Sequence, residues 1–150
     1  MKLALRLLPP TYLYIYTAGA IVLHFLFPVA KIIPTPQNYF GVLLMIVGIV
    51  LNIWADSLFK KNETTVKPLE KPSSLITEGP FTLSRHPMYV GFVLFLLGLA
   101  ILLGSVVAFI APVVMFITLE TVFISREEEN LLESFGKEYL DYKKKVRRWL

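Results

Sequence analysis

The sequence contains no cysteine and only two histidines, His24 and His86. A chain without cysteine has no disulfide bond, no thiolate nucleophile and no cysteine metal site, and no residues here stand at metal-ligand spacing. Charged residues are also scarce, at 17% of 150 residues, where soluble domains carry about a quarter. Because 55% of the chain is hydrophobic, we expect a metal-free integral membrane protein of one domain.

Charge is missing above all from four apolar stretches, residues 11–30, 39–59, 88–104 and 106–124. The first stretch contains no Asp, Glu, Lys or Arg, and a helix of that length covers about 30 Å, the hydrocarbon core of a bilayer. It is too long for the apolar region of a signal peptide, so we interpret it as a membrane anchor. The sequence predicts an all-α polytopic membrane protein with about four transmembrane helices.

The basic residues predict the orientation of these spans. Fourteen of the fifteen Lys and Arg residues fall on one side of the four spans, and only Lys31 falls on the other. Basic loops stay in the cytoplasm, so both termini and the 60–87 loop should be cytoplasmic. The net charge of +4 is then explained by anionic headgroups of the lipid bilayer and requires no nucleic-acid partner. The sequence gives no indication of the oligomeric state.

The tail, residues 126–150, has the pattern of an amphipathic cytoplasmic helix. Its apolar residues recur every three or four positions: Leu132, Phe135, Tyr139, Tyr142, Val146 and Trp149. Such a helix either lies in the plane of the membrane surface or packs back on the 60–87 loop as a lid. Gly136 is a candidate for a kink or a break.

A few polar residues interrupt the spans. His24 is interpreted as a histidine that is hydrogen-bonded to a neighbouring helix. Asp56 either reaches the interface or lines a polar cavity. Glu120 stands seven residues before Glu127, two turns along the same face if the helix is continuous, which indicates a cavity open to the cytoplasm. In contrast, Ser125 has capping-box spacing to Glu128, which predicts that a new helix starts there.

The join between the loop and the third span carries Arg85 and His86, followed by Pro87 as a suitable first helical residue. Tyr89 is one turn further, so its phenol can lie beside the imidazole. These residues either anchor the span at the interface or form a site with Glu127 and Glu128, because an ionisable pair at a membrane helix is costly unless it has partners.

Three ordered segments resemble the isoprenylcysteine carboxyl methyltransferases. They are Gly79 to Gly91 (GPFTLSRHPMYVG), the Glu127-Glu128 pair with Leu131, and Phe135 to Val146 (FGKEYLDYKKKV). Phospholipid methyltransferases share a looser form of this pattern. The resemblance covers roughly residues 73–148, and the set with its spacing is specific although each piece alone is weak.

The resemblance implies S-adenosylmethionine as the methyl donor, bound at the cytoplasmic face. Matched position by position, the donor site would contain Leu75, Ile76, Phe81, His86, Pro87, Met88, Tyr89 and Glu127. Phe81 stands where such enzymes can have tyrosine, so a hydroxyl contact would be lost. Arg85 and Glu120 are the candidate catalytic residues.

The implied acceptor is lipid-soluble: the carboxylate of a prenylated cysteine or a similar small prenyl substrate. A carboxylate is already ionised and needs no base, whereas an amine would need one, with Glu120 or His86 as candidates. Phe123 stands where isoprenylcysteine enzymes can have an arginine for the substrate carboxylate. A phospholipid amine or a thiol therefore stays open as acceptor. A sterol-reductase-like enzyme using NADPH and a non-catalytic membrane scaffold are the alternatives from other classes.

Overall fold

The computed structural model describes residues 8–27, 30–65 and 72–150. Every regular element in these ranges is a helix, and the one extended pairing there is an isolated bridge between Lys31 and Ser105. The predicted all-α fold is therefore confirmed for the described residues. Four of the cations used to predict the orientation, Lys2, Arg6, Lys67 and Lys71, lie outside those ranges, as does part of the 60–87 loop.

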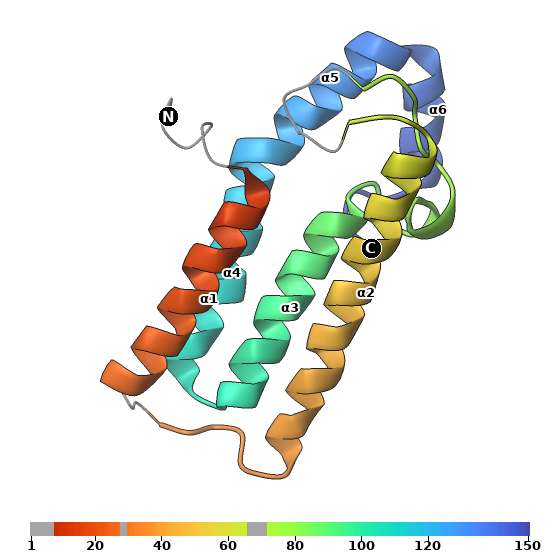
Figure 1. The fold of residues 1–150 in the computed structure, drawn as a ribbon. Coiled ribbons are helices and arrows are strands. Elements are labelled where there is room, and N and C mark those ends of the chain that lie inside the picture. The colour runs from red at the N-terminus through yellow and green to blue at the C-terminus, as the bar shows by residue number, and fades with distance from the viewer. Residues whose placement is uncertain (1–7, 28–29, 66–71) are drawn as a thin grey trace.

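Four apolar helices run alternately up and down as a bundle (Figure 1). They are α1 (Pro9–Leu26), α2 (Phe40–Lys61), α3 (Pro87–Leu103) and α4 (Ile110–Thr118). Each occupies one of the predicted apolar stretches, with its ends shifted by a few residues. Short 3₁₀ turns precede three of them: η2 (Gln37–Tyr39), η3 (Gly79–Thr82) and η4 (Val106–Phe109).

Two helical stretches are long and apolar enough to cross a membrane, Gln37–Lys61 and Val106–Phe135, and Pro87–Leu103 is a shorter apolar helix. The outward side chains of α2 agree with a lipid-facing surface, because Phe40, Ile46 and Ile53 are all exposed. An apolar residue that is exposed in a soluble protein costs free energy, whereas lipid is as apolar as the side chain.

The central helix is α3, which contacts α1, α2 and α4. Its packing against α2 depends on glycine. A Cβ atom added at Gly41 would lie 2.2 Å from the Gly98 carbonyl oxygen, and one at Gly48 would lie 2.5 Å from that of Gly91. The close helix approach expected for glycines in a membrane helix is therefore present, and any larger residue would force the two backbones apart.

An α-helix begins at Ser125, as its capping-box spacing predicted, but it continues the preceding helix without a break. From α4 the chain continues through a π-helix, η5 (Leu119–Ile124), directly into α5 (Ser125–Phe135), and the Ser125 residue begins α5 without any side-chain cap. A π-helix has more residues per turn than an α-helix. This changes which acidic residues of the segment share a face.

The tail forms two helices, α5 and α6 (Lys137–Lys145), which separate at Gly136, where φ is +50°. The expected break at this glycine is thus present. Of the two placements considered for the tail, contact with the loop is observed: the Tyr142 hydroxyl donates to the Phe81 carbonyl oxygen at 2.7 Å. At the opposite end of the bundle, His24 Nδ1 lies 2.9 Å from Ser105 Oγ, so this histidine has the interhelical partner that we expected.

Candidate functional site

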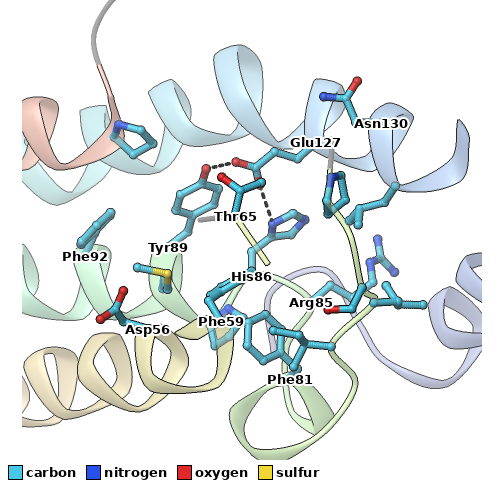
Figure 2. A pocket seen from close by; sticks show the side chains of 18 of the residues that line it. Asp56, Phe59, Thr65, Phe81, Arg85, His86, Tyr89, Phe92, Glu127 and Asn130 are labelled. Carbon is cyan, nitrogen blue, oxygen red and sulfur yellow. Dashed lines mark hydrogen bonds and ion pairs between the residues drawn. The ribbon is translucent and has the colours of Figure 1, made fainter. Parts of the chain in front are cut away.

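A cavity of about 320 Å³ lies where the loop before α3 meets α5, and this volume is in the range of small-molecule sites. Figure 2 shows most of its side chains, which come from the start, the middle and the tail of the sequence. The lining residues are Leu8, Pro9, Pro10, Asp56, Phe59, Thr65, Pro72, Ser74, Leu75, Ile76, Phe81, Arg85, His86, Pro87, Met88, Tyr89, Phe92, Glu127, Asn130, Leu131 and Tyr142.

One wall of the cavity is made by His86, Tyr89 and Glu127. His86 precedes Pro87, the first residue of α3, and has the φ of −129° that a residue before proline adopts readily. Its ring stacks on that of Tyr89, with centroids 5.6 Å apart and planes inclined by 5°. Glu127 joins both side chains: one carboxylate oxygen lies 3.2 Å from His86 Nδ1, and the other accepts a hydrogen bond from the Tyr89 hydroxyl.

Behind this wall, the buried Glu128 carboxylate contacts a cluster of cations. Its Oε1 lies 2.5 Å from Arg85 Nη2 and 3.1 Å from Arg148 Nε, and its Oε2 lies 2.8 Å from Arg148 Nη2. His86 Nε2 is 3.6 Å from Oε1, beyond hydrogen-bond distance but close enough for strong attraction. Arg85 and His86 line the cavity, whereas Glu128 and Arg148 do not.

The carboxylates determine the charge states in this cluster. Burial opposes protonation of His86, but the hydrogen bond to Glu127 and the proximity of Glu128 outweigh it and raise the pKa of the imidazole. Burial likewise opposes ionisation of Glu128, but His86, Arg148 and Arg85 together lower the pKa of its carboxyl well below the usual range. The two carboxylates therefore favour the protonated form of His86.

The remaining walls are mostly apolar. Ile76 and Phe81 are buried with Ala55 and Leu58 in a small cluster under the loop, and the Phe81 ring meets Phe59 edge to face at 5.5 Å. Asp56 also lines the cavity and forms an ion pair of 2.6 Å with exposed Lys60. Of the two roles considered for Asp56, lining a cavity describes its position, and reaching the interface stays a prediction.

Every residue expected at a donor site lines this one cavity: Leu75, Ile76, Phe81, His86, Pro87, Met88, Tyr89 and Glu127, with Arg85 beside them. Glu120 lies elsewhere. One oxygen of its carboxylate is bound by Arg148 and the other accepts from Trp149 Nε1 at 2.9 Å. The π-helix has more residues per turn than an α-helix, so Glu120 does not share a face with Glu127, although continuous α-helical spacing predicted that it would. Instead, Arg148 contacts both Glu120 and Glu128.

Phe123 lies outside the cavity as well. It is almost fully buried in the core of the bundle, where its ring meets Tyr12 edge to face at 5.8 Å. An acceptor carboxylate would therefore find neither an arginine nor an open surface at this position.

Some lining residues were not predicted. Asn130 and Leu131 follow Glu127 by three and four positions, which places them on the same helical face, so this spacing was a usable signal. The segment Leu8 to Pro10 carries no polar residue and gave no signal at all. No group of three or more potential metal-ligating side chains is found among the described residues.

The charged side chains of the wall suggest what the cavity could hold. Arg85 and His86 both line it, although His86 Nε2 faces Glu128 behind the wall. These two basic side chains could attract a ligand carboxylate, while Glu127 could accept from an ammonium or a hydroxyl. The apolar wall from Phe59, Ile76 and Phe81 would suit an aromatic ring. An amphipathic zwitterion fits this arrangement.

The comparisons with known proteins agree with one another. Residues 36–138 match the model of the family described as "Phospholipid methyltransferase". The protein-S-isoprenylcysteine O-methyltransferase of Xenopus laevis is 32% identical over 108 residues, which is 71% of this chain and 38% of that protein. The enzyme of the same name from Rattus norvegicus is 36% identical over 111 residues, covering 71% and 38% respectively.

The fold is also similar to a solved structure. A eukaryotic intramembrane Ras methyltransferase, the isoprenylcysteine carboxyl methyltransferase, superposes with a TM-score of 0.73 at 27% identity. The match covers 94% of this chain and 52% of that one. This chain therefore spans about half of the solved protein and 38% of the Xenopus laevis relative.

Proposed function

Because this chain belongs to the phospholipid methyltransferase family, we propose that it transfers a methyl group from S-adenosylmethionine to a lipid-soluble acceptor at the membrane. The observation that carries the proposal is the wall formed by His86, Tyr89 and Glu127, which lines a cavity next to apolar, lipid-facing helices. The relatives named as isoprenylcysteine O-methyltransferases support the same reaction type.

The donor supplies an electrophilic methyl group on a sulfonium. In this chain, Arg85 and His86 would attract its carboxylate, since both basic side chains line the cavity. Glu127 would accept a hydrogen bond from its ammonium or ribose. Phe59, Ile76 and Phe81 would exclude water from its adenine. These contacts would fix the methyl group toward the acceptor, so that positioning and desolvation supply most of the rate.

The first candidate acceptor is the carboxylate of a prenylated cysteine. The named relatives support it, and a carboxylate reacts without a base. Transfer to this acceptor would require no proton movement at His86, whose pKa is raised and which would act as a cation. Glu120, bound by Arg148 and Trp149 away from the cavity, would have no direct part in this transfer.

A second candidate is the amine of a phospholipid headgroup. It is favoured by a carboxylate on the cavity wall: Asp56 lines the cavity and its described ion-pair partner is the exposed Lys60, whereas Glu127 is held by His86. Asp56 could attract an ammonium acceptor and take up the proton that it must lose before attack. A thiol acceptor has no such support from the described residues.

Labelled methyl transfer separates these proposals. The protein in detergent or liposomes would receive S-adenosylmethionine with a labelled methyl group together with a farnesylated cysteine, phosphatidylethanolamine or a lipophilic thiol. Label in the farnesylcysteine supports the first acceptor, and label in the phospholipid supports the second. Thermal stabilisation by NADPH and not by S-adenosylhomocysteine would contradict the methyltransferase proposal and favour a reductase, and no response to either would favour a scaffold.

We also propose four membrane spans, α1 to α4, with both termini, the 60–87 loop and the cavity on the cytoplasmic side. The distribution of basic residues supports this orientation. Since the chain has no cysteine, single cysteines at Lys31 and Lys60 can be labelled without background. In intact cells an impermeant maleimide should label the Lys31→Cys variant only, and the reverse pattern would contradict the proposal.

A further inference from the structure

The residues after α6 run back along the loop that enters α3. We call Val146–Trp149 the return segment. Its backbone binds the junction at three points: Arg85 N donates to the Arg147 carbonyl at 3.0 Å, Ser84 Oγ to that of Arg148 at 3.0 Å, and Arg85 Nη1 to that of Val146 at 3.0 Å. The return segment thus holds the residues that immediately precede His86.

The side chains of the return segment connect two acidic residues of the fourth span and α5. Arg148 contacts both oxygens of Glu128 and one oxygen of Glu120. Trp149 donates its indole N–H to the other oxygen of Glu120 at 2.9 Å, and its ring packs on Phe116 at a centroid distance of 4.6 Å. Neither Arg148 nor Trp149 lines the cavity, so any influence of these two side chains on a ligand is indirect, and Glu128 is the contact through which the Arg148 side chain can act.

Glu128 is the link to the cavity. Its side chain is 6% exposed, and it contacts both Arg85 and His86, which line the cavity. A shift of the Glu128 carboxylate would therefore move or reorient both groups. The chain of contacts runs from Arg148 through Glu128 to the cavity.

A buried carboxylate keeps one orientation only if its oxygens are satisfied. Arg85 contacts Oε1 alone. Besides Arg148, the cation near Oε2 is Lys143, at 3.4 Å and with 46% of its side chain exposed. The guanidinium of Arg148 contacts both oxygens as a rigid fork, which an ammonium cannot do. Arg148 is thus the group that fixes the rotation of this carboxylate.

We infer that Arg148 is a positioning residue for the cavity: through Glu128 it sets the placement of Arg85 and His86, and the return segment is part of the framework of the site. That the ligand so positioned is the methyl donor rests on the proposed function. Glu120 takes part in the same framework by holding Arg148 and Trp149.

Two arginines of the return segment provide a matched pair of variants. Arg148→Gln removes the fork. Arg147→Gln removes the same charge one residue earlier, from an exposed side chain, and leaves the backbone carbonyl of residue 147 in place. Isothermal titration calorimetry with S-adenosylhomocysteine should show about tenfold weaker binding for Arg148→Gln and wild-type affinity for Arg147→Gln.

A second measurement reports on the network without any ligand. The charged groups around His86 are Glu127, Glu128, Arg85 and, through Glu128, Arg148 and Lys143. Loss of Arg148 leaves Glu128 less neutralised, so the titration midpoint of His86 in ¹⁵N NMR spectra should rise, while Arg147→Gln leaves it unchanged. Only two histidines contribute signals, and His24→Gln assigns them.

The conservative variant Arg148→Lys tests the geometry itself. It keeps the positive charge, but its single ammonium cannot reproduce the fork, so binding should be intermediate between wild type and Arg148→Gln. Wild-type affinity together with an unchanged His86 midpoint in folded Arg148→Gln would overturn the inference. If Arg148→Gln does not fold, Arg148→Lys takes its place, and a wild-type affinity and midpoint in that variant would overturn the inference. If the wild type does not bind S-adenosylhomocysteine, the proposed function fails, and the His86 midpoint alone decides the role of Arg148.

Discussion

Arg85 Nη2 and Glu128 Oε1 lie 2.5 Å apart although the two residues are 43 positions apart in the sequence. Both side chains are more than nine-tenths buried. A buried ion pair of this kind costs much desolvation, and removal of one partner leaves the other charge without compensation. The pair therefore makes the loop before α3 and the start of α5 dependent on each other.

Glu128→Gln should destabilise the protein by about 3 kcal/mol, because the buried Arg85 guanidinium would lose its carboxylate partner. Thermal unfolding in detergent, followed by circular dichroism, measures the change. Glu129→Gln is the matched control, since it alters the next residue on an exposed face and should leave the unfolding midpoint in place. Equal midpoints for both variants would show that the cluster contributes little to stability.

Glu127→Gln and His86→Ala should weaken S-adenosylhomocysteine binding by about tenfold or more with a smaller loss of stability than Glu128→Gln. Both residues line the cavity and bond each other, whereas Glu128 lies behind the wall. Isothermal titration calorimetry gives the affinities, again with Glu129→Gln as control. Wild-type affinity in both variants would place the donor elsewhere.

The raised pKa of His86 predicts a pH dependence of stability. A folded pKa above the usual 6.5 means that folding favours the protonated imidazole. This contribution is complete below about pH 6.5 and is lost as the pH rises through the folded pKa. The unfolding midpoint of the wild type should therefore approach that of His86→Gln as the pH rises above about 6.5. A difference that stays constant over this range would contradict the assignment.

Gly48→Ala should destabilise the bundle by about 1–3 kcal/mol, because the new methyl group would lie 2.5 Å from the Gly91 carbonyl oxygen. Gly19→Ala makes the same change in α1, where the added methyl group meets no other described atom within 4 Å. That control should be neutral or slightly stabilising, since alanine favours helix. Unfolding in detergent compares the two, and equal midpoints would mean that α2 and α3 can separate without cost.

Asp56→Asn distinguishes the two acceptors. If an ammonium headgroup binds at the cavity, loss of this carboxylate should reduce methyl transfer to phosphatidylethanolamine by about tenfold and leave transfer to farnesylcysteine unaffected or improved. Lys60→Gln, which removes the exposed partner of Asp56, is the control and should retain both activities. Equal loss of both activities in Asp56→Asn would assign Asp56 to the donor instead.

The sequence pattern was sufficient for the helices and for most of the cavity. Runs without charge predicted α1 to α4 within a few residues, because a bilayer requires apolar segments of nearly fixed length. The convergence of Arg85 and His86 with Glu127 and Glu128 was one of two interpretations of the sequence, since buried charges at a membrane need partners, and anchoring of the span at the interface was the other. Family resemblance added the apolar wall, including Ile76 and Phe81, which spacing alone did not indicate.

Other features depend on interactions that periodicity does not reveal. The π-helix Leu119–Ile124 shifts the helical face, so the partner of Glu120 through Arg148 is Glu128 and not Glu127. The apolar residues Leu8 to Pro10 line the cavity only because α1 packs beside α3. The sequence pattern placed Arg148 among the cations of a basic tail. Its contacts with Glu120 and Glu128 depend on the reversal of the chain after α6.

The return segment has a consequence for biosynthesis. A ribosome delivers residues in order, and Val146–Trp149 come after every element that they join: the loop before α3, the fourth span and α5. The Gly48 contact between α2 and α3 is available as soon as α3 has left the exit tunnel. The bundle can therefore assemble during translation, whereas the polar cluster under the cavity closes only after α6 has emerged.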